Sequence, residues 1–222
     1  MSIYDHRIIA FGTGQADAVT GHIVNAGAQA VAAEGGRLFA VFKPVIGLSS
    51  NQAIVLTEWA SETAALQHGG DVLRGLAGVV LSEHDLWEGT VRPTPGVSPT
   101  ETGGYYSHRA FDIQPADWPR FLELSETAWG NFEGAHASKV TGFWKARTPP
   151  VAGQLRVRLM AWYESLDAWE RSRWWNPKAR DGSDESFNRF RERSKLLLNT
   201  GVSILSRVPL PGEAGHAASA TI

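Results

Sequence analysis

The chain has 222 residues, with 21 lysines and arginines against 23 aspartates and glutamates, and it contains no cysteine. The lack of cysteine excludes disulfides, thiolate metal ligands and thiol nucleophiles. A net charge of −2 without a concentrated basic region argues against nucleic acid as a partner. The sequence has no run of about 18 apolar residues and no apolar signal segment near its N-terminus. We therefore expect a cytoplasmic protein with no membrane partner.

A four-residue motif occurs twice in the sequence. Residues 4–7 read YDHR and residues 106–109 read YSHR, 102 positions further on. Other matches follow in the same order: Phe42-Lys43 with Trp144-Lys145 at the same spacing, and Trp59 with Trp162 at a spacing of 103. Because the landmarks keep their order, the sequence predicts two copies of one structural unit.

The first copy alternates between strand and helix patterns. In chain order, the apolar periodicity predicts a strand at 3–11, a helix at 16–33, strands at 38–45 and 54–59, a second helix, and a closing strand at 79–87. The order is strand, helix, two strands, helix, strand, which is the ferredoxin-like pattern.

The second copy follows the same plan with a stronger first helix. Its predicted elements are a strand at 105–113, a helix that begins near Pro115, strands at 139–146 and 155–163, a helical region broken near Pro177 or Gly182, and a closing strand at 202–210. The arginines and lysines of its last helix, Arg193 among them, are interpreted as a solvated face.

A ferredoxin-like unit covers only one face of its sheet with helices. We therefore predict an α+β fold in which two tandem ferredoxin-like (βαββαβ) units pack sheet to sheet as an intrachain dimeric α/β barrel. The predicted boundaries are 1–95 for the first unit, 96–104 for a linker rich in Pro, Gly, Ser and Thr, 105–209 for the second unit and 210–222 for a flexible tail. Since each unit covers the other, we expect a monomer or a weak homodimer.

The repeated histidine and arginine are neighbours on a strand and therefore point to opposite faces. His6 and His108 share a face with the motif tyrosines, whereas Arg7 and Arg109 lie on the other. Two interpretations stay open. Either the histidines are structural and the arginines cap a helix or pair with an acid, or the histidines meet near the pseudo-twofold axis and move protons near neutral pH.

The side chains on the third strand of each unit indicate where a ligand would lie. The face of the second unit that carries Trp162 also carries Met160, Arg158 and Arg156, and the corresponding face of the first unit carries Trp59, Thr57, Val55 and Ala53. If both faces look inward, bulky cationic groups oppose small ones and leave room for an aromatic ligand with an anionic end. The alternative places the arginines at a solvent-facing sheet edge.

Common cofactor and metal motifs are missing. The sequence contains no GxGxxG after a strand, no phosphate-binding P-loop, no HExxH and no GxSxG. The histidines outside the motif have no acidic residue at ligand spacing: His22, His68, His84 and His136. We predict no metal site.

The second copy resembles a known family. The segments YYSHRAFDIQPADWPRFLELSETAW, GFWKA and WYESLDAWERSR are similar to NIPSNAP domains, which belong to the dimeric α+β barrel group with EthD-like proteins, muconolactone isomerases and small cofactor-free monooxygenases. The sequence departs from the family at His6 and His108, where an apolar residue is usual. The resemblance implies an interior pocket for a small hydrophobic or aromatic molecule.

Some members of that group bind haem. His84, His108 or His136 would then be the candidates for an axial ligand, but no spacing selects one of them. We therefore expect that the protein uses no cofactor.

Together these observations predict a cofactor-independent enzyme, a lyase, isomerase or dehydratase that transfers protons on a small aromatic or cyclic substrate. His108 and His6 would be acid and base, and Arg158 would hold an anionic oxygen. The predicted substrate-binding residues are Trp162, Trp59, Trp144, Tyr163, Arg156, Tyr106 and Arg109. The alternatives are a non-catalytic module that binds a small molecule or another protein, and a cofactor-free monooxygenase.

Overall fold

The structure is a computed structural model that describes residues 2–173, 176 and 184–213. The helix break expected near Pro177 or Gly182, and the part of the expected tail from residue 214 onward, lie outside the described residues. No described helix is both long and apolar enough to cross a membrane.

The first unit contains the six predicted elements. They are β1 (Ile3–Ala10), a continuous helical stretch made of α1 (Ala16–His22), the π-helical turn η1 (Ile23–Gly27) and α2 (Ala28–Ala33), then β2 (Arg37–Ile46), β3 (Gln52–Trp59), α3 (Glu62–His68) followed by the 3-10 turn η2 (Gly69–Leu73), and β4 (Val80–Arg92). The helix α3 begins at Ser61, whose side chain accepts a hydrogen bond from the backbone N–H of Ala64.

The second unit repeats this order. Its elements are β5 (Tyr105–Ile113), the 3-10 turn η3 (Pro115–Asp117), α4 (Trp118–Ala135), β6 (Ser138–Ala146), β7 (Leu155–Tyr163), α5 (Leu166–Arg171), α6 (Asp184–Ser194) and β8 (Leu197–Arg207). The long helix α4 follows the predicted apolar spacing, because Phe121, Leu124, Ala128 and Phe132 are all buried. Ser165 caps α5 as Ser61 caps α3.

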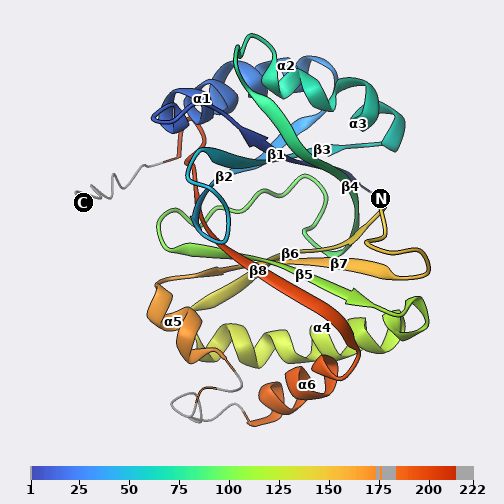
Figure 1. Ribbon diagram of the computed structural model, residues 1–222. Coiled ribbons are helices and arrows are strands. Elements are labelled where there is room, and N and C mark those ends of the chain that lie inside the picture. The colour runs from blue at the N-terminus through green and yellow to red at the C-terminus, as the bar shows by residue number, and fades with distance from the viewer. Residues whose placement is uncertain (1, 174–175, 177–183, 214–222) are drawn as a thin grey trace.

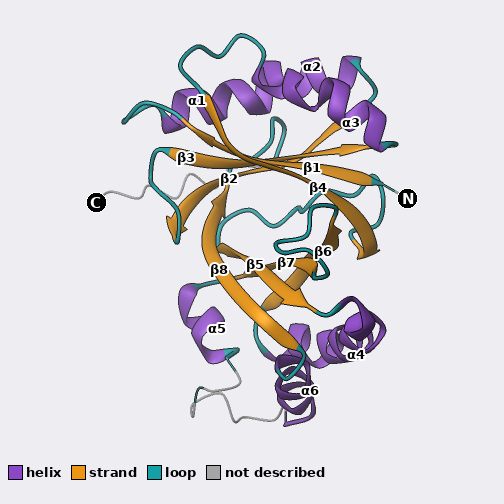
Figure 2. Ribbon diagram, turned by 45° about the vertical axis from the view of Figure 1, so that its right-hand side comes forward, coloured by secondary structure: helices purple, strands orange, loops and turns teal. Residues whose placement is uncertain are grey.

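The eight strands close into one barrel in the order β1-β3-β2-β8-β5-β7-β6-β4. The antiparallel pairs β2–β8 and β4–β6 join the two four-stranded halves. Figure 1 shows α1, α2 and α3 over the outer face of one half and α4, α5 and α6 over the outer face of the other, and the turned view in Figure 2 shows the same two outer layers. The predicted fold is confirmed, and the barrel is complete within one chain.

Alternation along the strands divides the buried residues into three cores. One core lies inside the barrel and contains Tyr4, Tyr106 and Trp144. Each of the other two lies between a sheet and its own helices. Trp59 belongs to the helix-side core of the first unit, so the expectation that it faces the barrel interior is wrong.

The register of the strands explains this error. Ile3 on β1 pairs with Trp59, and Tyr105 on β5 pairs with Tyr163. The structural counterpart of Trp59 is therefore Tyr163 and not Trp162. A shift of one residue moves a strand side chain to the opposite face of the sheet.

Candidate functional site

The two motif histidines meet inside the barrel. The ring centroids of His6 and His108 are 5.3 Å apart, and the His6 ring stacks on Trp87 with a centroid distance of 4.2 Å. Both side chains are buried. The predicted contact across the pseudo-twofold axis is thus present.

The barrel interior keeps these histidines neutral. Burial, followed by the positive charge of Arg158, lowers the pKa of His108 to about 3. Burial and the neighbouring His108 lower the pKa of His6 well below its usual value. The expectation that they titrate near neutrality is therefore wrong, whereas their role as acid and base stays a prediction.

The two strand arginines predicted to hold an anion already have acidic partners. Arg158 lies 3.3 Å from a carboxylate oxygen of Glu83. Arg156 donates two hydrogen bonds to the carboxylate of Asp112, from Nε at 2.7 Å and from Nη2 at 3.0 Å. Their charges are therefore largely compensated within the chain.

The other predicted binding residues divide between two compartments. Trp144 and Tyr106 lie in the barrel interior, and Trp162 packs at its margin. Tyr163 and Arg109 lie on the helix-facing side of the second unit, where they line a cavity. Because alternate residues of a strand face opposite sides, this second group does not contact a molecule beside the histidines.

That cavity has a volume of about 190 Å³ and lies between the outer face of the second sheet and helices α4 and α6. An apolar cavity of roughly 150 Å³ in another protein accommodates benzene, so a small aromatic molecule fits in this larger cavity. Its walls include Phe111, Trp129 and Phe132. Its polar lining comes from hydroxyl and guanidinium groups: Ser107, Arg109, Tyr163, Ser172, Arg173, Arg193, Ser194 and Thr200. Among the described residues that line it there is no carboxylate.

Arg193 reaches the cavity from α6. Only 9% of this residue is exposed, and its guanidinium carbon lies 4.9 Å from the ring centroids of Phe111 and Phe190. Its Nη1 donates a hydrogen bond to Ser125 at 3.1 Å. Burial, followed by the positive charges of Arg109 and Arg173, lowers the pKa of Arg193 to about 9. The prediction of a solvated face is wrong for this residue.

Two more guanidinium groups line the same cavity. Burial, and then the charge of Arg173, lowers the pKa of Arg109 to about 10. Arg173 donates a hydrogen bond from Nη2 to the hydroxyl of Tyr163 at 2.9 Å and lies over the Trp169 ring. With pKa values of about 10 and about 9, Arg109 and Arg193 stay protonated at neutral pH, so the cavity is apolar in its walls and cationic at one side.

Sequence reasoning missed Ser107, Arg173 and Arg193. Arg193 lies on α6 and Arg173 follows the end of α5, and both reach the sheet only in the folded chain. Ser107, however, is the one residue that differs between the two copies of the motif, YDHR and YSHR. That difference was the available signal.

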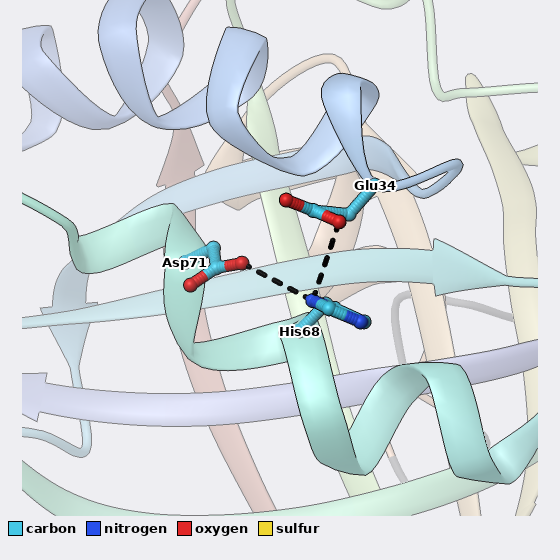
Figure 3. A group of neighbouring side chains, drawn as sticks. All are labelled: Glu34, His68 and Asp71. Atoms are coloured by element: carbon cyan, nitrogen blue, oxygen red, sulfur yellow. Dashed lines mark ion pairs between the residues drawn. The ribbon is translucent and has the colours of Figure 1, made fainter.

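A separate cluster in the first unit brings two acids to His68. Figure 3 shows Glu34 and Asp71 with oxygens directed at its Nδ1, at 3.5 Å and 3.4 Å. All three offer ligand atoms within 4.8 Å of one another, so the expectation that His68 lacks nearby acids is wrong. Asp71 also pairs with Arg74 at 2.9 Å. The three side chains form a partly exposed polar cluster on the surface of the first unit.

The cavity does not suit a haem group. An axial ligand would need an imidazole that faces the cavity, and none of the described lining residues is a histidine. His108 lies in the barrel interior, and His84 is held beside Asp5 at 3.3 Å.

The closed barrel and its outer helices define a dimeric α/β barrel in a single chain. A candidate monooxygenase from Fusobacterium nucleatum subsp. nucleatum shares this fold with a TM-score of 0.60, at 10% identity over 94% of this chain and 93% of its own. An anthrone oxidase-like protein gives 0.61 at 13% identity, over 94% and 92%. A chlorite dismutase variant from Candidatus Nitrospira defluvii gives 0.59 at 8% identity, over 94% and 92%.

At these identities the similarity establishes the fold and leaves the activity open. No protein-family model matches the chain, and no curated protein matches it. The resemblance to NIPSNAP domains therefore stays a prediction.

Proposed function

We propose that the protein is a cofactor-free monooxygenase that binds a small aromatic molecule as its anion in the cavity of the second unit. The observation that carries this proposal is the pair of buried arginines, Arg109 and Arg193, beside an aromatic cavity with no carboxylate among its described lining residues. Buried cations without an anion are costly, and a ligand anion would compensate them.

The arginines would lower the pKa of a bound phenol or enol. Each unit of that shift corresponds to about 1.4 kcal/mol of preference for the anion. Deprotonation makes the ring electron-rich. With 1-naphthol as the example, the ring carbon opposite the oxygen bonds to dioxygen, its hydrogen leaves as a proton, and the hydroperoxide loses water to form a carbonyl. The sum is C10H8O plus O2 giving C10H6O2 plus H2O.

The cavity supports oxygenation better than the predicted lyase or isomerase chemistry. Removing a proton from carbon needs a base that faces the ligand. Among the described lining residues the cavity offers hydroxyl groups and arginines, and His108, with its pKa near 3, lies in a different compartment. The shared fold of an anthrone oxidase-like protein and a candidate monooxygenase adds support.

Oxygen uptake tests the proposal. We expect the protein to oxidise 1-naphthol or a related small phenol with one O2 consumed per quinone formed, no turnover under argon and no effect of EDTA. Arg109→Gln should lower kcat/KM at least tenfold, because it removes a cation beside the anion. Turnover that continues under argon would contradict oxygenation, and ligand binding without turnover of any phenol would identify a binding module.

A further inference from the structure

The first unit contains a filled version of the same site. Arg7 occupies the position that Arg109 has in the second unit, one residue after the motif histidine. Its Nη2 donates a hydrogen bond to Oδ2 of Asp5 at 2.8 Å, and its Nε lies 2.8 Å from Oδ1. Asp5 is 1% exposed and Arg7 8% exposed. The guanidinium thus lies 2.8 Å from each oxygen of one buried carboxylate and donates a hydrogen bond to one of them.

The second unit lacks that carboxylate. Ser107 stands at the position of Asp5, with a shorter side chain and no charge. The Nη2 of Arg109 is buried and has no hydrogen-bond partner among the described residues, although the matching Nη2 of Arg7 has one. Leaving a buried donor of a charged group without a partner is destabilising. The cavity beside it is where a partner would lie.

A third pair of corresponding positions, Gly69 and Arg173, also gives the second unit more positive charge than the first. Gly69 lies eight residues after the N-cap Ser61, and Arg173 lies eight residues after the N-cap Ser165. A Cβ on Gly69 would be 2.0 Å from Oδ2 of Asp5. The first unit therefore packs bare backbone against its internal carboxylate, whereas the second unit supplies another cation at the corresponding point.

We infer that the ligand of the second unit carries a carboxylate, or another anion with two oxygens, that binds Arg109 as Asp5 binds Arg7. The inference deepens the proposed function, since it rests on an anion in the same cavity and names its chemical class. In the first unit, the carboxylate of Asp5 occupies the place that the ligand's carboxylate takes in the second unit. The aromatic part of the ligand packs against Phe111 and Trp129.

The charges of the two sites support this assignment. Asp5 and Arg7 sum to zero, whereas Ser107 and Arg109 sum to +1 before Arg193 is added. A monocarboxylate therefore leaves the second site cationic, so a phenolate on the same ring is also compensated. An ortho-hydroxy aromatic acid combines both groups.

Calorimetry on the whole chain compares benzoate with benzyl alcohol, which has the same ring and no charge. We expect benzoate to bind at least tenfold more tightly. Ser107→Asp should abolish benzoate binding, because its carboxylate takes the ligand's place on Arg109, and should raise Tm. Ser107→Asn, of similar size and uncharged, should keep benzoate affinity within a few-fold.

Equal affinity for benzoate and benzyl alcohol, or an equal loss in both Ser107 variants, would overturn the inference. Should the Asp variant not fold, the comparison of the two ligands on the unchanged chain decides alone. The outcome is separate from the oxygenase test. Oxidation of 1-naphthol with no preference for benzoate rejects only the carboxylate, and benzoate binding without oxidation of any phenol rejects only the oxygenase.

Discussion

The two helix-covered faces of the barrel have the same backbone plan and opposite interiors. In the first unit, aliphatic side chains such as Ile23 and Val31 fill the space between sheet and helices, and a Cβ on Gly27 would lie 2.3 Å from the backbone oxygen of Val72. In the second unit, aromatic side chains surround a cavity of about 190 Å³. One face is neutral and filled, and the other is cationic and hollow.

The comparison shows how little separates a structural core from a candidate site. Asp5 against Ser107 and Gly69 against Arg173 change the charge, and Trp59 against Tyr163 replaces an indole by a phenol that accepts a hydrogen bond from Arg173. The strands that carry these residues are equivalent. The candidate site thus lies where the ion pair of the first unit has no counterpart among the described residues of the second.

Removing Asp5 should have the largest effect on stability. Asp5→Ser copies the second unit and leaves Arg7 buried without its carboxylate, which costs roughly 3–5 kcal/mol. Urea unfolding at pH 7 measures the loss. Formate should restore part of it, because it supplies two oxygens to the vacated place.

Ser107→Ala is the matched control, and it should cost less than about 1 kcal/mol since its guanidinium neighbour already lacks a carboxylate. A similar cost at Asp5 and Ser107, with no response to formate, would mean that the two sites are energetically alike.

The next largest effect on stability should come from pH, through the two histidines in the barrel interior, where the two units still match. The pKa of His108 is about 3 and that of His6 is well below its usual value, whereas both titrate near 6.5 in the unfolded chain. As the pH falls below about 6.5, the unfolded state takes up protons that the folded state does not. The free energy of unfolding should then fall by about 1.4 kcal/mol per pH unit for each histidine.

Urea unfolding between pH 7 and pH 5 checks this slope, in a range where most carboxylates stay ionised. His6→Phe keeps a ring against Trp87 and removes one titrating group, so it should roughly halve the slope. A slope unchanged by this substitution would show that the histidines are not its source.

Substitution of one glycine in each unit tests how tightly the helices pack on the two sheets. These substitutions have the smallest expected effects on stability. Gly27→Ala in the first unit should destabilise by about 1–3 kcal/mol, because the new methyl group meets the Val72 oxygen. Gly130→Ala in α4 should stabilise by roughly 0.5–1 kcal/mol, since nothing lies within 4 Å of its Cβ position. Thermal unfolding of both variants measures the contrast, and the same sign in both would contradict it.

The order of strands and helices could be predicted from the sequence because alternation and helical spacing are local, and the duplicated motif supplied the pairing of the two units. The compartment of each side chain was harder to predict. Trp59 was assigned to the wrong face by an error of one residue, since the weak similarity around β3 did not fix the register.

The cavity itself could not be predicted from the sequence. It depends on how α6 packs on α4, and the spacing of Arg193 along its helix does not reveal that it points between two aromatic rings. The missing carboxylate at Ser107 was visible in the sequence, but its meaning required the ion pair of Asp5 and Arg7 in three dimensions.

The stretch of chain from β4 to β5 joins the two halves covalently, and this has a consequence for how they can diverge. In a barrel built from two identical chains, one gene encodes both halves, so any substitution appears in both at once. Serine in one half and aspartate in the other would then be impossible. In a single chain each half is encoded separately, so equivalent positions can carry different residues. One half can then keep a stabilising salt bridge while the other has serine in place of the aspartate and space for a ligand.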